Sequence, residues 1–212
     1  MQVLAISPDR CVEHQNLLKQ MHQRRANVFA GRLEWDVTIT DGGERDQCDD
    51  LNPTYILATF GGNNVVGCAR LLPAAGPTML ERTFPQLLAD GSLHATSAMI
   101  ESSRFCVDTT LPAGGGGNQL HHATLTLFAG IIEWSMANGY DKIVTATDLR
   151  FERILNRAGW PMTRLGEPVA IGNTIAIAGT LPADEKSFER VRPPHYRSAV
   201  TCADAYSERS AA

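Results

Sequence analysis

The segment Met99–Asp108 places the strongest constraint on the fold, because it puts two charges inside an otherwise apolar strand. Its ends are apolar or β-branched, which predicts a largely buried strand. A buried charge is costly unless it is paired or hydrogen-bonded, so Glu101 and Arg104 each need a partner. The two residues are an odd number apart, and a flat strand would direct them to opposite faces. If both serve one site, the strand must bulge between them, whereas a structural ion pair or a strand exposed on one face needs no bulge.

Hydrophobic periodicity predicts alternating strands and helices along the chain. We expect a strand at residues 2–6, a helix at about 12–29, a hairpin of strands 55–60 and 65–72, a short helix within 79–88, the charged strand, a helix at 119–138, a strand at 143–147, a helix at about 148–159 and one or two strands within 166–180. This order predicts an α/β fold, a single-domain three-layer α-β-α sandwich with a mixed sheet. We assign residues 1–190 to this domain and expect the polar residues 191–212 to form a loose tail.

Composition and charge exclude several classes of protein. With 212 residues, of which 43% are hydrophobic and 20% charged, the chain resembles a soluble globular protein with a real core. A net charge of −4 argues against a general nucleic-acid binder, and no apolar run approaches membrane-spanning length. We therefore expect no nucleic-acid partner and no membrane insertion. Residues 1–8 lack a signal-peptide pattern, and the five scattered cysteines lack metal-ligand spacing, which predicts reduced thiols, no metal site and a cytoplasmic location.

Two loops carry ambiguous signals. Residues 41–50 are acidic and rich in turn residues, which on their own are more typical of a solvated loop than of a binding site. Gly114–Gly117 come before a helix, and such a cluster can cradle phosphate through its backbone amides. A flexible loop is the commoner meaning, and the cluster lacks the established nucleotide-binding glycine patterns.

Several short motifs together resemble one protein family, the LuxI-type acyl-homoserine-lactone synthases, and within it the TraI-type synthases of rhizobia. The motifs are Met21–Phe29, Leu33–Val37, Glu44–Asp49, Gly67–Pro73, Gly76–Leu80 and Glu101–Phe105. Their order and spacing are highly specific, and the resemblance extends from the first strand to Ala178. It implies a fold similar to the GNAT N-acyltransferases.

The resemblance also implies an activity. Members of the family transfer an acyl chain, usually from acyl-carrier protein and sometimes from coenzyme A, to the amine of S-adenosylmethionine. They then form the lactone and release methylthioadenosine, in the service of quorum sensing. Because S-adenosylmethionine is a substrate, no cofactor is expected. The family's invariant positions match Arg25, Phe29, Trp35, Asp46, Asp49, Arg70, Glu101 and Arg104. Cys48 departs from the aromatic residue common between the two aspartates, and we expect only a local change in packing.

The chemistry suggests a role for each of these positions. A carboxylate near the protonated amine can act as general base, and Glu101 is our candidate, with Ser103 and Arg104 as further catalytic residues. A backbone amide of the bulge can stabilise the oxyanion. Arg25, Arg70 or Arg104 can hold the substrate carboxylate, and Phe29 and Trp35 can cover the adenosyl and sulfonium groups. Asp46 and Asp49 would pair with the arginines or bind the amine; alternatively, the ion cluster only anchors the N-terminal segment.

The acyl chain and its carrier need two further surfaces. The candidates for the acyl pocket are Met79, Phe105, Thr145, Ala146 and Leu155, with Leu80, Val144 and Ile154 as weaker candidates that fit plain core equally well. Thr145 matches a position where relatives that accept 3-oxo chains carry threonine, so we expect a 3-oxo chain of medium length, with 3-oxo-octanoyl favoured. Acyl-carrier protein is acidic, and Arg150, Arg153 and Arg157 recur at helical spacing as a docking stripe or as a solvated helix face.

Two rival functions remain open. The first is a GNAT-like acyltransferase that uses acyl-coenzyme A and another amine, although the chain lacks that family's pyrophosphate loop. The second is a non-catalytic module that binds S-adenosylmethionine or an acyl chain. The intact Glu101 and the arginines argue against this second function.

Overall fold

The computed structural model describes residues 1–109 and 122–200. Within them, nine strands form one mixed sheet in the order β11-β1-β4-β5-β6-β7-β10-β8, with β9 paired to β10. The strands are β1 (Gln2–Ile6), β4 (Thr54–Phe60), β5 (Asn64–Pro73), β6 (Met99–Val107), β7 (Lys142–Asp148), β8 (Thr163–Arg164), β9 (Val169–Ile171), β10 (Thr174–Pro182) and β11 (Ser198–Ala199). A separate small hairpin is made of β2 (Ile39–Thr40) and β3 (Gly43–Glu44).

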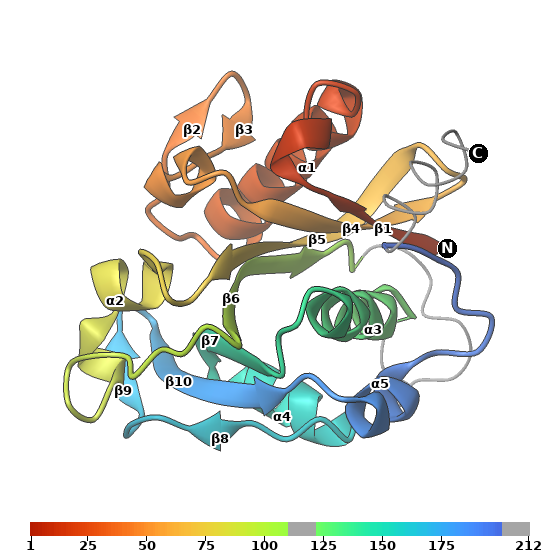
Figure 1. The fold of residues 1–212 in the computed structure, drawn as a ribbon. Coiled ribbons are helices and arrows are strands. Elements are labelled where there is room, and N and C mark those ends of the chain that lie inside the picture. Colours follow the sequence, from red (N-terminus) through yellow and green to blue (C-terminus); the bar gives the residue numbers. More distant parts are fainter. Residues whose placement is uncertain (110–121, 201–212) are drawn as a thin grey trace.

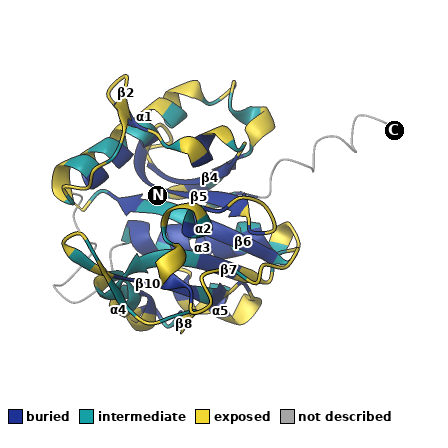
Figure 2. Ribbon diagram, turned by 90° about the vertical axis from the view of Figure 1, so that its left-hand side faces the viewer, coloured by how far each residue is buried: buried dark blue, intermediate teal, exposed yellow. Residues whose placement is uncertain are grey.

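Helices cover both faces of this sheet (Figure 1). α1 (Gln15–Ala26) lies on one face, and α3 (His122–Ala137), α4 (Leu149–Arg157) and α5 (Glu185–Val191) lie on the other. The short helix α2 (Met79–Thr83) belongs to the connection between β5 and β6. Figure 2 shows the strands as the buried middle layer, with the exposed residues on the outer sides of the helices and in the loops. The predicted three-layer α-β-α sandwich with a mixed sheet is confirmed.

The alternation of side chains along the strands produces a separate core on each face. On β4, Ile56 and Ala58 are buried in the cluster that contains the α3 side chains. The residues between them in the sequence, Tyr55 and Leu57, are buried in the cluster that contains Met21 of α1. Successive residues of a strand point to opposite faces, so a nearly continuous apolar run can serve both layers at once.

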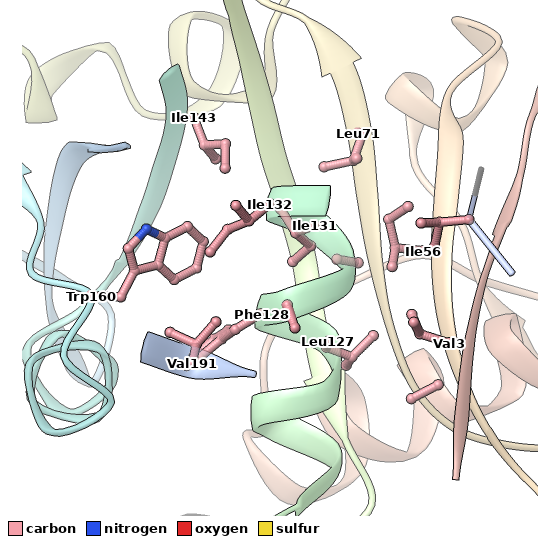
Figure 3. Packing of buried hydrophobic residues seen from close by; sticks show 14 of the residues in the cluster. Val3, Ile56, Leu71, Leu127, Phe128, Ile131, Ile132, Ile143, Trp160 and Val191 are labelled. Atoms are coloured by element: carbon pink, nitrogen blue, oxygen red, sulfur yellow. The ribbon is translucent and has the colours of Figure 1, made fainter. Parts of the chain in front are cut away.

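Helix α3 is apolar around most of its circumference because it packs between the sheet and the remaining helices. Figure 3 shows Leu127, Phe128, Ile131 and Ile132 of α3 between Val3, Ile56 and Leu71 on one side and Ile143, Trp160 and Val191 on the other. Gly130 lets this helix approach β1 closely. A Cβ atom at this position would lie 2.5 Å from Cγ2 of Val3 and 3.2 Å from Cγ2 of Ile56.

Replacing Gly130 with alanine is expected to destabilise the protein by up to about 2 kcal/mol, the packing cost less the gain in helix propensity. Alanine favours a helix by about 1 kcal/mol over glycine, but forcing a methyl group into a close-packed core costs about 1–3 kcal/mol. The free energy of unfolding in urea measures the effect. Gly76→Ala is the matched control, since its nearest neighbour would be the Pro73 carbonyl oxygen at 3.6 Å. Equal stability of the two variants would show that α3 can move away from β1 at little cost.

The structure differs from the sequence expectations at several places, among them α5, β8 and the hairpin of β2 and β3, which were not expected. The helix expected at 12–29 begins at Gln15, and its last part, Asn27–Arg32, is a wider π-helical turn. The loose tail expected after residue 190 does not hold for residues 191–200: Val191 and Val200 are buried, and β11 pairs with β1 in parallel. The glycine cluster at 114–117 lies outside the described residues.

Candidate active site

Strand β6 contains a bulge at Arg104, the second of its two charged residues. Cys68 and Arg70 of β5 are two residues apart, but their partners on β6, Cys106 and Ser103, are three apart. The additional residue therefore falls in the Arg104–Phe105 segment, and Arg104 itself has a left-handed backbone with φ of +53°. This conformation is uncommon for a residue with a side chain. The bulge lets Glu101, Ser103 and Arg104 all line one cleft.

The cleft opens where two parallel strands separate. β6 and β7 pair only from Met99 to Glu101, opposite Lys142 to Val144. Beyond this point both strands continue, and a cleft of about 990 Å³ lies between them, lined by residues 103–107 of β6 and 145–148 of β7. The π-helical turn, the following residues 33–37, α2 with the residues just after it, α4 and the turn between β9 and β10 supply further walls. An elongated substrate can therefore enter between the separated strands.

Glu101 is a buried carboxylate at the closed end of the cleft. Its side chain accepts hydrogen bonds from the backbone N–H groups of Met79, at 2.8 Å, and Leu80, at 2.7 Å, in the first turn of α2. These bonds fix its position. Burial raises the pKa of Glu101 above the ordinary value of 4.5, although the two amides act in the opposite direction. The carboxylate is thus held rigidly with an increased affinity for a proton.

Arg25 lies at the centre of a buried ion cluster on the α1 side. Its guanidinium donates two hydrogen bonds to Asp49, at 2.7 and 2.8 Å, and its Nε donates to Glu44. The side chains of all three residues are fully buried. Burial tends to raise the pKa of Asp49, but the Arg25 guanidinium outweighs it and holds that pKa well below its usual range. Arg25 and Asp49 do not line the cleft and belong to the ion cluster, so their direct contact with the substrate stays a prediction.

Arg70 links this cluster to β6. It pairs with Asp46 at 2.5 Å and with Asp49 at 3.0 Å, and its Nε donates to the Ser103 hydroxyl at 3.1 Å. Its side chain is fully buried and does not reach the cleft. Asp46 caps the turn Gln47–Asp50 in a reciprocal capping box with Asp49. The acidic loop is therefore folded around the arginines and is no solvated loop.

Arg104 is the arginine of this group that lines the cleft. It donates to Glu44 at 3.1 Å and pairs with Asp46 at 2.7 Å. Its guanidinium lies 5.4 Å from the centre of the Phe29 ring, and Phe29 in turn stacks on Trp35, with ring centres 5.3 Å apart and planes inclined by 13°. Trp35 is 37% exposed, so a stacked aromatic pair and a cation lie together at the cleft.

The residues expected at the acyl pocket divide into two groups. Met79, Phe105, Thr145 and Ala146 line the cleft, as do the weaker candidates Leu80 and Ile154. Leu155 is buried behind the cleft, beside a hollow of about 20 Å³ that also touches Phe105 and Thr145. Val144 is fully buried core. Among the described residues, no His, Cys, Asp and Glu side chains are grouped as metal ligands, and no helix combines the length and apolar character that crossing a membrane requires.

Two of the three exposed arginines of α4 line the cleft. Arg150 and Arg157 lie on the face that lines the cleft, together with Phe151 and Ile154. Arg153 is exposed but does not reach the cleft. All three are exposed, and the spacing i, i+3, i+7 places them on one side of α4, so the docking stripe stays a prediction.

Comparison with known proteins identifies the family. Residues 9–191 match the autoinducer synthases. The chain belongs to this family. It is 74% identical over 212 residues to an acyl-homoserine-lactone synthase of Rhizobium radiobacter and 65% identical over 212 residues to one of Agrobacterium fabrum, with 100% of each chain covered in both cases. These relatives confirm the resemblance to the rhizobial synthases, and the chain is an enzyme of the acyltransferase class.

Solved structures confirm the fold of this autoinducer synthase. BjaI, a coenzyme A-dependent acyl-homoserine lactone synthase solved with S-adenosylmethionine and isopentyl-coenzyme A, superposes with a TM-score of 0.81. The identity is 24%, and the match covers 93% of this chain and 92% of BjaI. A protein assigned as an N-acetyltransferase from Lactobacillus plantarum gives a TM-score of 0.53 at 14% identity, covering 87% of this chain and 100% of its own. The likeness to the GNAT fold is confirmed.

Two residues of the synthase site escaped the sequence analysis. Glu44 is fully buried and bridges Arg25 and Arg104, although the motif that contains it was assigned only its aspartates. The Tyr55 hydroxyl donates to Asp49 at 2.8 Å. Glu44 lies two residues before Asp46 in an acidic run, a signal that could have suggested it. The alternation of β4 places Tyr55 on the α1 face, but nothing in the sequence connects it to Asp49.

Proposed function

We propose that this enzyme is a cytoplasmic acyl-homoserine-lactone synthase that serves quorum sensing. It would transfer an acyl chain from acyl-carrier protein to the amine of S-adenosylmethionine and then close the lactone, releasing methylthioadenosine. The observation that carries this proposal is the position of Glu101. A rigid, buried carboxylate with a raised pKa lines the same cleft as Arg104 and the Phe29–Trp35 stack.

In the first step, Glu101 takes a proton from the ammonium group of S-adenosylmethionine. An amine must lose this proton before it can attack a thioester, and a fixed carboxylate of raised pKa accepts it well. The free amine then attacks the thioester carbon, and negative charge develops on its oxygen. A backbone N–H of the bulge at Arg104–Phe105 is our candidate for stabilising that charge. The carrier thiol leaves as the tetrahedral intermediate collapses.

In the second step, the substrate carboxylate attacks the carbon next to the sulfonium, and methylthioadenosine leaves. Ring closure is intramolecular, so it requires mainly a fixed conformation. Arg104 is suited to hold the carboxylate, because it lines the cleft and is itself oriented by Glu44 and Asp46. The Phe29–Trp35 stack would cover the adenosyl and sulfonium groups. Ser103 also lines the cleft and accepts a hydrogen bond from the buried Arg70.

The acyl chain is proposed to run along β7, with 3-oxo-octanoyl as the favoured chain. Thr145 lines both the cleft and the hollow behind it, and its hydroxyl makes only a long 3.4 Å hydrogen bond with the carbonyl of Ala146. A 3-oxo group in the cleft would accept a better hydrogen bond from this hydroxyl.

Replacing Thr145 with valine is expected to reduce the preference for 3-oxo over unsubstituted donors by about five- to tenfold, since one hydrogen bond is worth about 1 kcal/mol. The ratio of kcat/KM for the two donors measures the effect. Thr147→Val is the matched control, because Thr147 is the next residue on the same face of β7 and also lines the cleft. An unchanged ratio in Thr145→Val, or an equal change in both variants, would contradict this assignment.

The carrier remains a choice between two donors. Arg150, Arg153 and Arg157 are exposed on α4 and would suit the acidic surface of acyl-carrier protein. BjaI is a coenzyme A-dependent enzyme of the same fold, so acyl-coenzyme A is the second candidate. Both donors carry the acyl chain as a thioester on a phosphopantetheine arm.

The test of the proposed function is mass spectrometry of culture extract from a heterologous bacterium that expresses the chain, beside one that expresses Glu101→Ala. We expect an acyl-homoserine lactone from the unaltered chain only, and its mass gives the chain length and the oxo state. Soluble, folded protein that makes no lactone, in culture or with purified donors, would favour a coenzyme A acyltransferase acting on another amine.

A further inference from the structure

We infer that Arg32 and Arg150 form a binding site for the phosphate of the donor's phosphopantetheine arm. The inference rests on the proposed function, because it requires a thioester donor of that kind. The phosphate is common to acyl-carrier protein and coenzyme A, so the site serves either donor.

The strand register places both arginines at the open end of the cleft. β6 and β7 are parallel, and their last paired residues are Glu101 and Val144. Arg150 comes six residues after Val144, at the start of α4. Six residues of extended strand from Glu101 reach Val107, where β6 ends. The carboxyl ends of the two strands therefore lie toward the same edge of the sheet, about 20 Å from Glu101 on β6 and about 13 Å from Val144 on β7, which ends at Asp148.

Arg32 is attached to that same edge from the opposite wall. It is the last residue of the π-helical turn, and its Nη1 donates to the hydroxyl of Thr109 at 2.8 Å, two residues beyond the end of β6. Arg32 and Arg150 are both exposed and both line the cleft. One arginine thus stands on the β6 side of the opening and the other on the β7 side.

Two of the four acidic residues that line the cleft have hydrogen-bond partners of their own. Asp148 caps α4 by accepting from the backbone N–H of Phe151 at 2.7 Å, and Glu101 is held by the amides of α2. The other two, Glu34 and Asp36, are exposed on either side of Trp35, beside the position proposed for S-adenosylmethionine, whose sulfonium is positive.

The chemistry of the donor fits this arrangement of charge. A thioester at Glu101 and Ser103 sends its pantetheine arm along the separated strands toward the open end. The arm ends in a phosphate, which is esterified to a serine in acyl-carrier protein and is part of a diphosphate in coenzyme A; in both donors its anionic oxygens can accept from guanidinium groups. Arg32, attached beside the end of β6, and Arg150, just beyond the end of β7, would hold it from both strands. The phosphate would thereby fix how far the arm extends into the cleft.

The experiment compares three donors that carry the same acyl chain: acyl-carrier protein, coenzyme A and pantetheine, which lacks the phosphate. In the unaltered enzyme, we expect acyl-pantetheine to have a KM about tenfold or more above that of acyl-coenzyme A. In the double variant Arg32→Gln/Arg150→Gln, the KM for both phosphorylated donors is expected to rise by about the same factor. The KM for acyl-pantetheine and for S-adenosylmethionine should change by less than about twofold, so the difference between donors disappears.

Arg190→Gln is the matched control, because it removes an exposed arginine from α5, outside the cleft. It should leave the KM values of all three donors unchanged. Arg150→Gln alone repeats the test should the double variant fold poorly. An equal rise for acyl-pantetheine would overturn the inference, and so would a rise confined to acyl-carrier protein, which would indicate contact with the carrier's own surface. If the unaltered enzyme turns over none of the three donors, the proposed function itself is wrong.

Discussion

Replacing Glu101 with glutamine is expected to lower kcat by about 100- to 10,000-fold, the range that a positioned general base contributes. Glutamine keeps the size of the side chain but cannot accept the proton of the substrate ammonium. It also turns an amide N–H toward one of the two backbone donors of α2, which weakens the anchor that holds the residue. The release of methylthioadenosine at saturating concentrations of both substrates measures kcat.

Glu81 provides the control that separates catalysis from anchoring. Glu81 lies on α2, the helix whose amides bind Glu101. Its carboxylate accepts from the backbone N–H of Leu93 at 3.2 Å and from the hydroxyl of Thr78. It does not line the cleft. Glu81→Gln should lower the melting temperature by an amount similar to Glu101→Gln and leave kcat within about threefold. A similar loss of kcat in both variants would show that Glu101 acts only by holding α2 in place.

The pH dependence of kcat/KM, which reports the ionisations of the free enzyme, gives a second measure of the same group. Burial raises the pKa of Glu101, and only its deprotonated form can accept a proton. Activity should therefore be full at high pH and fall as the pH drops through this raised pKa, so that the acidic limb lies above pH 4.5, the ordinary value for a glutamate. The residual activity of Glu101→Gln should lack this limb. An acidic limb that persists in the variant would assign the titration to another group.

The bulge shows what local sequence can decide. Glu101 and Arg104 are three residues apart in an apolar strand, and the parity of a strand predicts an irregularity between them if both serve one site. Periodicity predicted most of the strands and helices in the same way, because the spacing of apolar residues that identifies an element lies within a short stretch of sequence. The motifs that resemble the synthase family then identified which charged residues belong together.

Long-range pairing explains what the sequence left open. The pairing of β11 with β1 joins residues almost two hundred positions apart, and neither short segment carries a signal of its partner. The partners of Arg25, Arg70 and Arg104 come from different elements, so no local pattern tells which of the three reaches the cleft. Only the packing of α1 against the sheet assigns Arg25 to the interior and Arg104 to the surface of the site.

Arg25 carries the prediction with the largest effect on stability. Replacing it with methionine is expected to lower the free energy of unfolding by about 3–5 kcal/mol, since the buried carboxylates of Asp49 and Glu44 lose their fully buried cation and keep only Arg70 and Arg104 as partners. Urea unfolding measures the loss. Arg24→Met is the matched control on the same helix. Arg24 pairs with Asp108 at 2.6 Å at a partly exposed position, so its loss should cost about 1 kcal/mol.

A second substitution distinguishes anchoring from substrate binding. In Arg25→Met/Asp49→Leu, one of the two carboxylates that lost Arg25 is also removed. About 1–3 kcal/mol of the lost stability should therefore return. Activity should stay low, because Glu44 has lost the partner that fixes its hold on Arg104. A direct ligand of S-adenosylmethionine would behave differently: Arg25→Met would raise the KM for that substrate and barely change stability. Large destabilisation with partial recovery would show that Arg25 positions the catalytic strand through the ion cluster. Arg104 would then be the residue of the cluster that contacts the substrate.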